Sequence, residues 1–196
     1  MKKLVILLVI IPIVAMLKLS NAFASTENGI GAGFQMVGSN PSITIKMRGL
    51  SVTPLELQYS YILNHGHEVS MNLYILHTKY FKLHLIDPGI LLGKTLSGVD
   101  VGQQYDISLG GGIEATIWRR LVIFANARVY LPDPNAASKY IDNQTQQAGE
   151  STAGQTSDIN QIYDASQKAA YNSVNDIYGK ALRNYRLIFG AMWFFW

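Results

Sequence analysis

The chain has 196 residues and no cysteine, with 16 basic and 13 acidic residues. Without cysteine, a disulfide framework and thiolate chemistry are excluded. Three of the basic residues (Lys2, Lys3 and Lys18) and none of the acidic ones precede residue 25, so residues 25–196 carry 13 of each sign. This formally neutral remainder has no basic cluster, and we expect no nucleic-acid partner.

Residues 1–24 have the pattern of a cleavable secretory signal peptide. Two lysines precede an apolar run from Leu4 to Leu17, and small residues end the segment at Ala24. The run is shorter than the roughly 20 residues that a membrane-spanning helix needs. We therefore expect an exported protein in which residues 25–196 form a single domain.

Alternating apolar and polar residues, the two-residue period of β-strands, recur along the rest of the chain. The clearest case sets Leu57 and Tyr59 against Glu56, Gln58 and Ser60. In chain order we expect eight strands, over 30–36, 43–48, 55–61, 69–75, 81–85, 107–117, 121–131 and 186–196. The predicted fold class is mainly β, an eight-stranded antiparallel transmembrane barrel with a long α-helix before the last strand.

The predicted connections differ in length between the two ends of this barrel. One end has short connections near Gly49, Thr78 and Arg119. The other end has long ones, from about 87 to 104 and from 132 to 185, together with two short turns near Ser39 and Asn64. Short periplasmic turns and longer outside loops are typical of bacterial outer-membrane barrels.

Charges of both signs lie on the less apolar strand face, which we expect to form the interior. An eight-stranded barrel is just wide enough for side chains to fill it, and each buried charge needs a partner. We therefore predict a structural network of paired charges in the lumen, with an ion or substrate path as the alternative. Its predicted members are Lys46, Arg48, Glu56, Glu68, Lys82, His84, Glu114 and Arg128.

The insertion at 132–185 begins as a polar segment, interpreted as a mobile loop with at most one short helix, and changes to a helical pattern over 157–183. Its apolar and small residues share one helix face at helical spacing. We expect this stripe to pack on the barrel rim, on a neighbouring subunit or on a membrane surface. The predicted packing and oligomer stripe consists of Ile159, Ile162, Tyr163, Ser166, Ala170, Val174, Ile177 and Ala181.

The C-terminal stretch from Arg186 to Trp196 is almost wholly apolar and ends on an aromatic residue. We expect its even-numbered positions, from Ile188 to Trp196, to face lipid, with Arg186 on the same face at the membrane boundary. The ending resembles the C-terminal signal of bacterial outer-membrane β-barrels, in which Phe194 and Trp196 would be the barrel-assembly signal. The alternative is the closing strand of a soluble sheet.

In size, topology and ending, the chain resembles the small OmpA/OmpX-type barrels. The resemblance implies the outer membrane of a Gram-negative bacterium, with outer-membrane lipids and the barrel-assembly machinery as partners. The helical insertion is atypical of those proteins. We therefore expect a non-enzymatic structural or interaction role, with a homo-oligomer enclosing lipid or water, and we assign no catalytic residue, metal or cofactor.

Three alternatives to this function remain open. A lipid-modifying enzyme acting on lipid A acyl chains would use His65 or His67 with Ser60, Glu68 or Ser70, although no motif joins them. A second alternative is a narrow porin-like pore. A third is a soluble periplasmic β-sandwich or lipocalin-like carrier.

Overall fold

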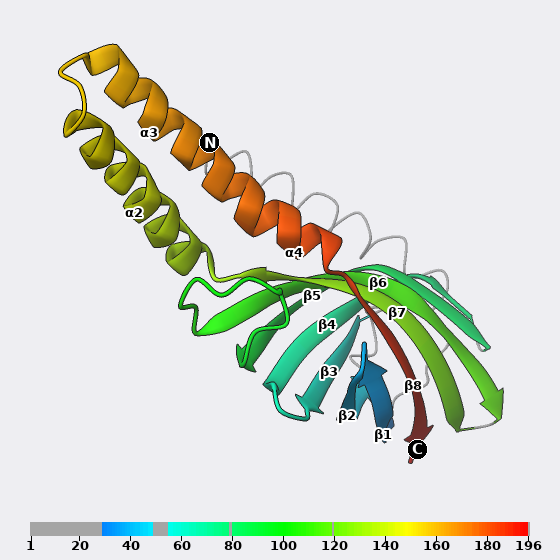
Figure 1. The fold of residues 1–196 in the computed structure, drawn as a ribbon. Helices are drawn as coiled ribbons and strands as arrows, with labels where there is room; N and C mark the ends of the chain where they lie inside the picture. The colour runs from blue at the N-terminus through cyan, green and yellow to red at the C-terminus, as the bar shows by residue number, and fades with distance from the viewer. Residues whose placement is uncertain (1–28, 49–54, 79, 119, 196) are drawn as a thin grey trace.

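A computed structural model describes residues 29–48, 55–78, 80–118 and 120–195. Eight antiparallel strands close into a barrel, and a helical insertion projects from one end of it (Figure 1). The predicted fold class is thereby confirmed. The predicted signal peptide, the turn near Gly49, Arg119 and Trp196 lie outside the described residues.

Each strand pairs with its neighbours in the sequence, and the first pairs with the last. The strands are β1 (Gly29–Val37), β2 (Asn40–Arg48), β3 (Leu55–Ile62), β4 (Gly66–His77), β5 (Phe81–Gly93), β6 (Tyr105–Trp118), β7 (Leu121–Pro132) and β8 (Arg186–Phe194). Closure joins Gly31 to Phe194 and Val37 to Ile188. A closed sheet leaves no unpaired edge on which another chain can add a strand.

The alternation in the sequence separates the two faces of most strands. In β3, Glu56, Gln58 and Ser60 are buried inside the barrel, whereas Leu57 and Tyr59 lie on its outer surface. The same inward-polar, outward-apolar arrangement runs through β2 and β4. The barrel therefore has a polar interior and an apolar exterior.

Strand β5 is longer than the sequence predicts. It continues through Asp87 and Pro88 to Gly93, where we expected a connection. A register shift lies between His84 and Asp87, so that these two residues both face inward although they are three positions apart. A bulge of this kind interrupts the alternation, and the Asp-Pro-Gly sequence is typical of a turn.

The predicted orientation of β8 is wrong. Ile188, Met192 and Phe194 point into the barrel and are at most 6% exposed, while Phe189 and Trp193 lie outside. Arg186 also has the inward parity, because it pairs with inward-facing Arg128. Both faces of β8 are apolar, so its own pattern does not distinguish them. Pairing with the neighbouring strands decides the orientation.

The insertion contains two long helices where we expected a loop with at most one short helix, followed by one long helix. Helix α2 (Pro134–Ala153) occupies the predicted loop; the Asp133 side chain caps it by accepting a hydrogen bond from the Asn135 backbone N–H at 2.9 Å. Its composition is polar, and its buried face uses small residues such as Ala137. A helix of this composition gives almost no amphipathic signal.

The second helical segment confirms the predicted helix before the last strand. It comprises α3 (Ile159–Val174), a single π-helical turn η2 (Asn175–Gly179) and α4 (Lys180–Arg183). Helices α2 and α3 pack side by side as a hairpin that leads away from the barrel (Figure 1). Within the described residues, no α-helix combines the length and apolar character needed to cross a membrane as a helix.

Gly190 should be essential for closing the barrel. A Cβ atom there would lie 2.7 Å from the Phe34 carbonyl oxygen and 2.8 Å from Phe124 Cε1. We expect Gly190→Ala to lower the free energy of unfolding by about 1–3 kcal/mol, the usual cost of overpacking. Urea titration of the folded barrel in detergent would measure it. Gly154→Ala is the control, because the nearest atoms lie at 3.6 Å and φ is −70°; equal losses would contradict the packing account.

Candidate functional site: the charged barrel interior

The structure places all eight predicted lumen charges inside the barrel. Seven of them are at most 2% exposed, and the side chain of Arg48 is 7% exposed. They come from six consecutive strands, β2 to β7. Together with neighbouring polar residues they form two ion clusters at different levels of the barrel.

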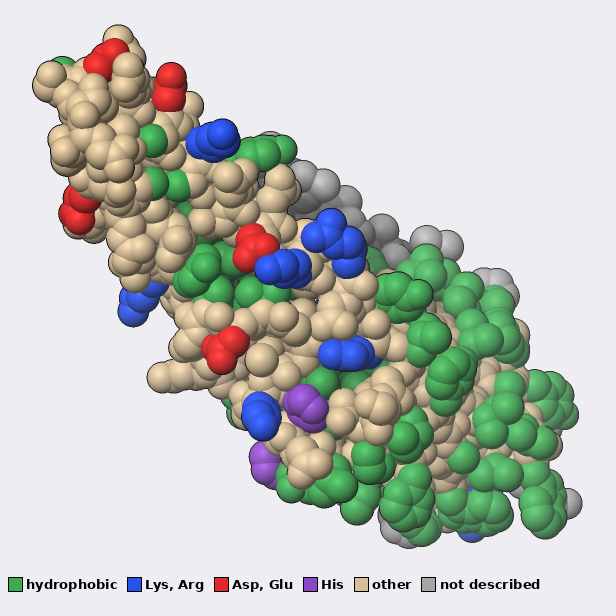
Figure 2. Space-filling view, viewed as in Figure 1, with side chains coloured by type: hydrophobic (Ala, Val, Ile, Leu, Met, Phe, Trp, Pro, Cys, Tyr) green, Lys and Arg blue, Asp and Glu red, His purple; other side chains and the backbone are tan. Residues whose placement is uncertain are grey.

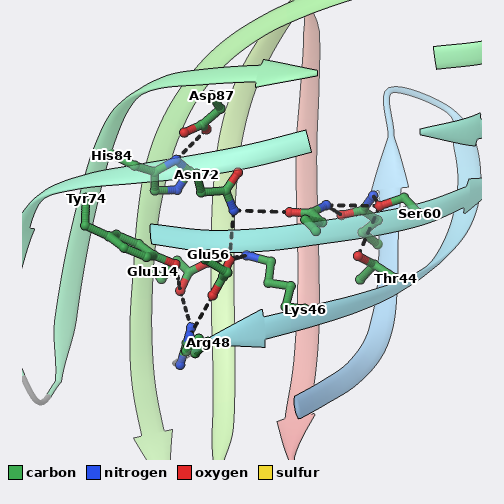
Figure 3. A network of polar contacts seen from close by, with 12 residues as sticks. Thr44, Lys46, Arg48, Glu56, Ser60, Asn72, Tyr74, His84, Asp87 and Glu114 are labelled. Atoms are coloured by element: carbon green, nitrogen blue, oxygen red, sulfur yellow. Dashed lines mark hydrogen bonds and ion pairs between the residues drawn. The ribbon is translucent and has the colours of Figure 1, made fainter. Parts of the chain in front are cut away.

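The first ion cluster joins Lys46, Arg48, Glu56 and Glu114 (Figure 3). Glu56 lies 3.0 Å from Lys46 Nζ and 2.6 Å from Arg48 Nε, and Glu114 pairs with both cations. The Tyr74 hydroxyl donates a hydrogen bond to Glu114 at 3.2 Å. Since β2 and β6 are on opposite sides of an eight-stranded ring, these ion pairs cross the lumen.

Inward aromatic rings complete this cluster. The guanidinium carbon of Arg48 lies 3.9 Å from the ring centroid of Phe194, and Lys46 Nζ lies 4.4 Å from that of Phe124. Cations over aromatic faces gain electrostatic stabilisation, which increases when water is excluded. The inward orientation of Phe194, which sequence reasoning missed, therefore gives the buried cations an apolar but attractive neighbour.

The second ion cluster is centred on Glu68. Its carboxylate accepts hydrogen bonds from Arg128 Nη1 at 2.6 Å, Ser108 Oγ at 2.7 Å and Tyr130 Oη at 3.1 Å. Arg128 Nη2 also lies 3.9 Å from Asp87 Oδ2. The same Asp87 carboxylate is in contact with His84 Nδ1. Sequence reasoning missed Asp87, because the residue lies beyond the expected end of its strand.

Amides and hydroxyls fill the interior beside these clusters. The Gln35 amide donates to Ser60 Oγ at 3.0 Å, and Ser60 Oγ donates to Thr44 Oγ1 at 3.1 Å. Asn72 links this network to the first ion cluster by donating to Glu56 at 2.8 Å and to Gln58 at 3.3 Å. These hydrogen bonds satisfy polar groups that would otherwise be costly to bury.

The charges of the two ion clusters, taken with Lys82, which pairs with Glu114 in the strand register, balance. The cations Lys46, Arg48, Lys82 and Arg128 are matched in number by the carboxylates Glu56, Glu68, Asp87 and Glu114. Paired charges of this kind tolerate burial, whereas an unpaired one would be strongly destabilising. The arrangement is suited to filling the lumen and bracing opposite walls of the barrel.

The histidine and serine candidates for catalysis are not brought together. His67 lies on the outer surface, where its Nδ1 is 2.6 Å from Tyr59 Oη. Ser60 and Ser70 point into the interior on the other face of the sheet. His65 Nδ1 lies 3.1 Å from the Lys94 carbonyl oxygen. Among the described residues, no three acidic or histidine side chains are grouped to hold a metal ion.

The predicted helix stripe divides into a buried and an exposed part. Ser166 packs against α2, where a Cβ on Gly149 would lie 2.8 Å from its Oγ, and Ile162 is half-buried nearby. Ile177 and Ala181 are fully buried at the base of the hairpin. The exposed part consists of Ile159, Tyr163 and Val174, with Ala170 half-buried beside them.

These features define the class of the protein: a closed eight-stranded antiparallel barrel with a charged interior and a helical hairpin between its last two strands. No protein-family description matches the chain, and no curated protein or solved structure is significantly similar to it. The functional interpretation therefore rests on the geometry alone.

Removing one carboxylate from the first ion cluster should be strongly destabilising. Glu114→Gln leaves Lys46 and Arg48 with Glu56 as their only remaining carboxylate in the cluster. We expect a loss of about 3–5 kcal/mol in the free energy of unfolding, measured by urea titration. The control Asp176→Asn breaks the exposed pair with Lys180 and should cost at most about 1 kcal/mol. A Glu114→Gln variant as stable as this control would refute the bracing role.

Proposed function

We propose that the protein is a non-enzymatic outer-membrane barrel with a structural or interaction role. The observation that carries this proposal is the inverted polarity of the barrel. Hydrophobic side chains gather over its outer surface, whereas the hairpin surface is mostly polar (Figure 2). Water favours the opposite arrangement, and extended exposed apolar surfaces mark contact with a membrane or a partner.

The distribution of aromatic residues supports a lipid environment. Trp118 and Trp193 lie on the outer surface near the short turns, with ring centroids 6.4 Å apart, and Tyr80 and Phe81 lie at the same end. Aromatic girdles at the membrane interfaces are a feature of outer-membrane barrels. Strands of 8–14 residues are also long enough to cross, since about 9–11 tilted residues suffice.

The two ends of the barrel suggest its orientation. Strand β4 is joined to β5, and β6 to β7, through few residues, and these strand ends lie where β8 finishes. The 94–104 loop and the helical hairpin lie at the other end, together with the short turns between β1 and β2 and between β3 and β4 (Figure 1). By the general rule for bacterial barrels, the end where β8 finishes is periplasmic and the hairpin is outside the cell.

The hairpin supplies the interaction surface in this proposal. Ile159 and Tyr163 are 79% and 60% exposed, and Tyr171 and Leu182 add further exposed apolar area. Burying these side chains against a second copy would remove apolar surface from water. Self-association of this kind would produce a homo-oligomer that encloses lipid or water between its subunits.

The geometry favours this role over the alternatives. Ion pairs that cross the lumen obstruct a porin-like path, and the candidate Ser and His side chains lie on opposite faces of the sheet. A soluble carrier would instead need a polar outer surface. Lipid binding along the apolar exterior is part of the proposed role.

A charge placed on the outer face should distinguish a membrane barrel from a soluble one. Ile45, near the middle of β2, is 40% exposed. In lipid vesicles we expect Ile45→Arg to lower the free energy of unfolding by about 2–4 kcal/mol, the cost of arginine at the bilayer midplane. Gln161→Arg, at an exposed position of α3 on the helix face opposite the stripe, is the control and should have little effect. Similar small effects at both positions would count against membrane insertion.

Self-association through the hairpin is tested by charges on its exposed stripe. Tyr163→Glu and Val174→Glu should each convert an oligomer into a monomer, because a buried carboxylate would lack a partner. Mass measurement by sedimentation in detergent would show the change. Gln161→Glu lies on the opposite helix face and should leave the mass unaltered. A wild-type protein that is monomeric under the same conditions would exclude this mode of assembly.

A further inference from the structure

A layer of polar atoms inside the barrel has no hydrogen-bond partner. Asn72 connects it to the first ion cluster through Glu56, and Arg128 connects it to the second through Glu68. The unpartnered atoms are Ser70 Oγ, Asn72 Oδ1, His84 Nε2, Asp87 Oδ1, Asn126 Nδ2 and Oδ1, and Arg128 Nε and Nη2. Their residues are at most 4% exposed, so bulk water does not reach them directly.

Cross-strand pairing places these side chains around three inward glycines. Gly112 lies between His84 and Asn126 in the register. Gly110 lies between Asp87 and Arg128, and Gly89 pairs with Ser70. Because these three glycines have no side chain, the polar ends of the neighbouring side chains occupy the interior next to them. The unpartnered atoms therefore form one contiguous mid-barrel layer.

The chemistry of the layer selects a neutral ligand that both donates and accepts hydrogen bonds. Arg128 and the Asn126 amide offer donors, whereas Asp87 Oδ1 and Asn72 Oδ1 offer acceptors. The Arg128 charge is already paired with Glu68, so no ion is required to neutralise it. Each buried polar atom left without a partner is destabilising, and a bridging ligand would restore its hydrogen bond.

We propose that this mid-barrel layer is an internal binding site for small neutral hydrogen-bonding molecules, of which water is the smallest. Buried water molecules typically make about three hydrogen bonds to polar groups of this kind. The site does not depend on membrane insertion, so a test of this site is independent of a test of the proposed function.

The ends of the barrel differ in how they are closed over this site. Nine of the ten described residues in the buried apolar cluster are on strands, where backbone pairing holds them; Val122, Met192 and Phe194 are those toward the short-turn end. At the hairpin end, Leu96 from the 94–104 loop is 1% exposed and is the one member of this cluster that is not on a strand. It packs with the strand residues Val37, Ile62, Leu91, Tyr130 and Ile188. A loop side chain can leave without breaking strand pairing. Leu96 is therefore the stopper, and access is from the hairpin end.

One carboxylate holds this stopper in place. Asp106 accepts hydrogen bonds from the Leu96 backbone N–H at 2.7 Å, the Ser97 backbone N–H at 3.1 Å and Thr95 Oγ1 at 2.8 Å. The Gln103 amide donates to the same carboxylate at 3.3 Å. Hydrogen bonds to a charged group are about twice as strong as neutral ones. Replacing the carboxylate by an amide should loosen the loop while preserving its shape.

Cysteine accessibility tests both the site and its stopper, because the chain has no cysteine of its own. Ser70→Cys places a thiol in the layer without breaking a hydrogen bond, since Ser70 Oγ has none. The folded variant in detergent is treated with methyl methanethiosulfonate, a small neutral reagent, alone and with Asp106→Asn. We expect modification in both, at least about tenfold faster with Asp106→Asn. Leu96→Ala replaces Asp106→Asn if that variant does not fold.

An exposed cysteine serves as the control for reagent activity in this experiment. Ser151→Cys, which is exposed on α2, should react at once in either background. Failure of Ser70→Cys to react in both backgrounds, while Ser151→Cys reacts, would show that small molecules do not reach the layer. Equal rates with and without Asp106→Asn would rule out Leu96 as the stopper. Rapid reaction of Ser70→Cys with a bulky maleimide in the intact loop would show an open lumen in place of a closed site.

Discussion

The barrel depends on ion pairs that cross its lumen. Glu114 on β6 pairs with Lys46 and Arg48 on β2, which lies on the opposite side of the ring. Opposite walls are therefore joined directly, in addition to the hydrogen bonds between neighbouring strands. Because buried charges are stable only when paired, this interaction requires the matched set of cations and carboxylates that fills the interior. It also explains why Phe194 faces inward, over the guanidinium of Arg48.

A charged interior has a consequence for the exterior. Each strand places alternate residues on opposite faces, so a sequence that puts its polar residues inside puts its apolar residues outside. The outer surface can then be stable only against lipid or another apolar surface, which underlies the proposed outer-membrane role. With ion pairs crossing the lumen, the parts available for contact with lipid or with another protein are the apolar exterior and the helical hairpin. The hairpin buries half of its predicted stripe, Ser166 and Ile162 against α2 and Ile177 and Ala181 at its base. It leaves Ile159, Tyr163 and Val174 exposed.

Much of this architecture could be predicted from the sequence, for an identifiable physical reason. Where one strand face is polar and the other apolar, as in β3, the alternation gives both the strand and the direction of its side chains. Prediction from this alternation failed where the two faces of an element do not differ clearly in polarity or where the period is interrupted. Both faces of β8 are apolar, the bulge after His84 shifts the period within β5, and α2 is polar on nearly every side. The partners of each charge could not be predicted either, because pairs such as Lys46 with Glu114 are set by closure of the whole ring.

The most direct test of the inverted barrel is the environment of an outward-facing side chain. Trp193 lies on the outer surface of β8, and it can be made the only tryptophan by Trp118→Phe and Trp196→Phe. Its fluorescence would be measured in vesicles whose lipids carry bromine on the acyl chains, and separately with acrylamide in the water. A lipid-facing exterior predicts strong quenching by the brominated lipids and weak quenching by acrylamide. The reverse result would contradict a barrel with its apolar face in the membrane.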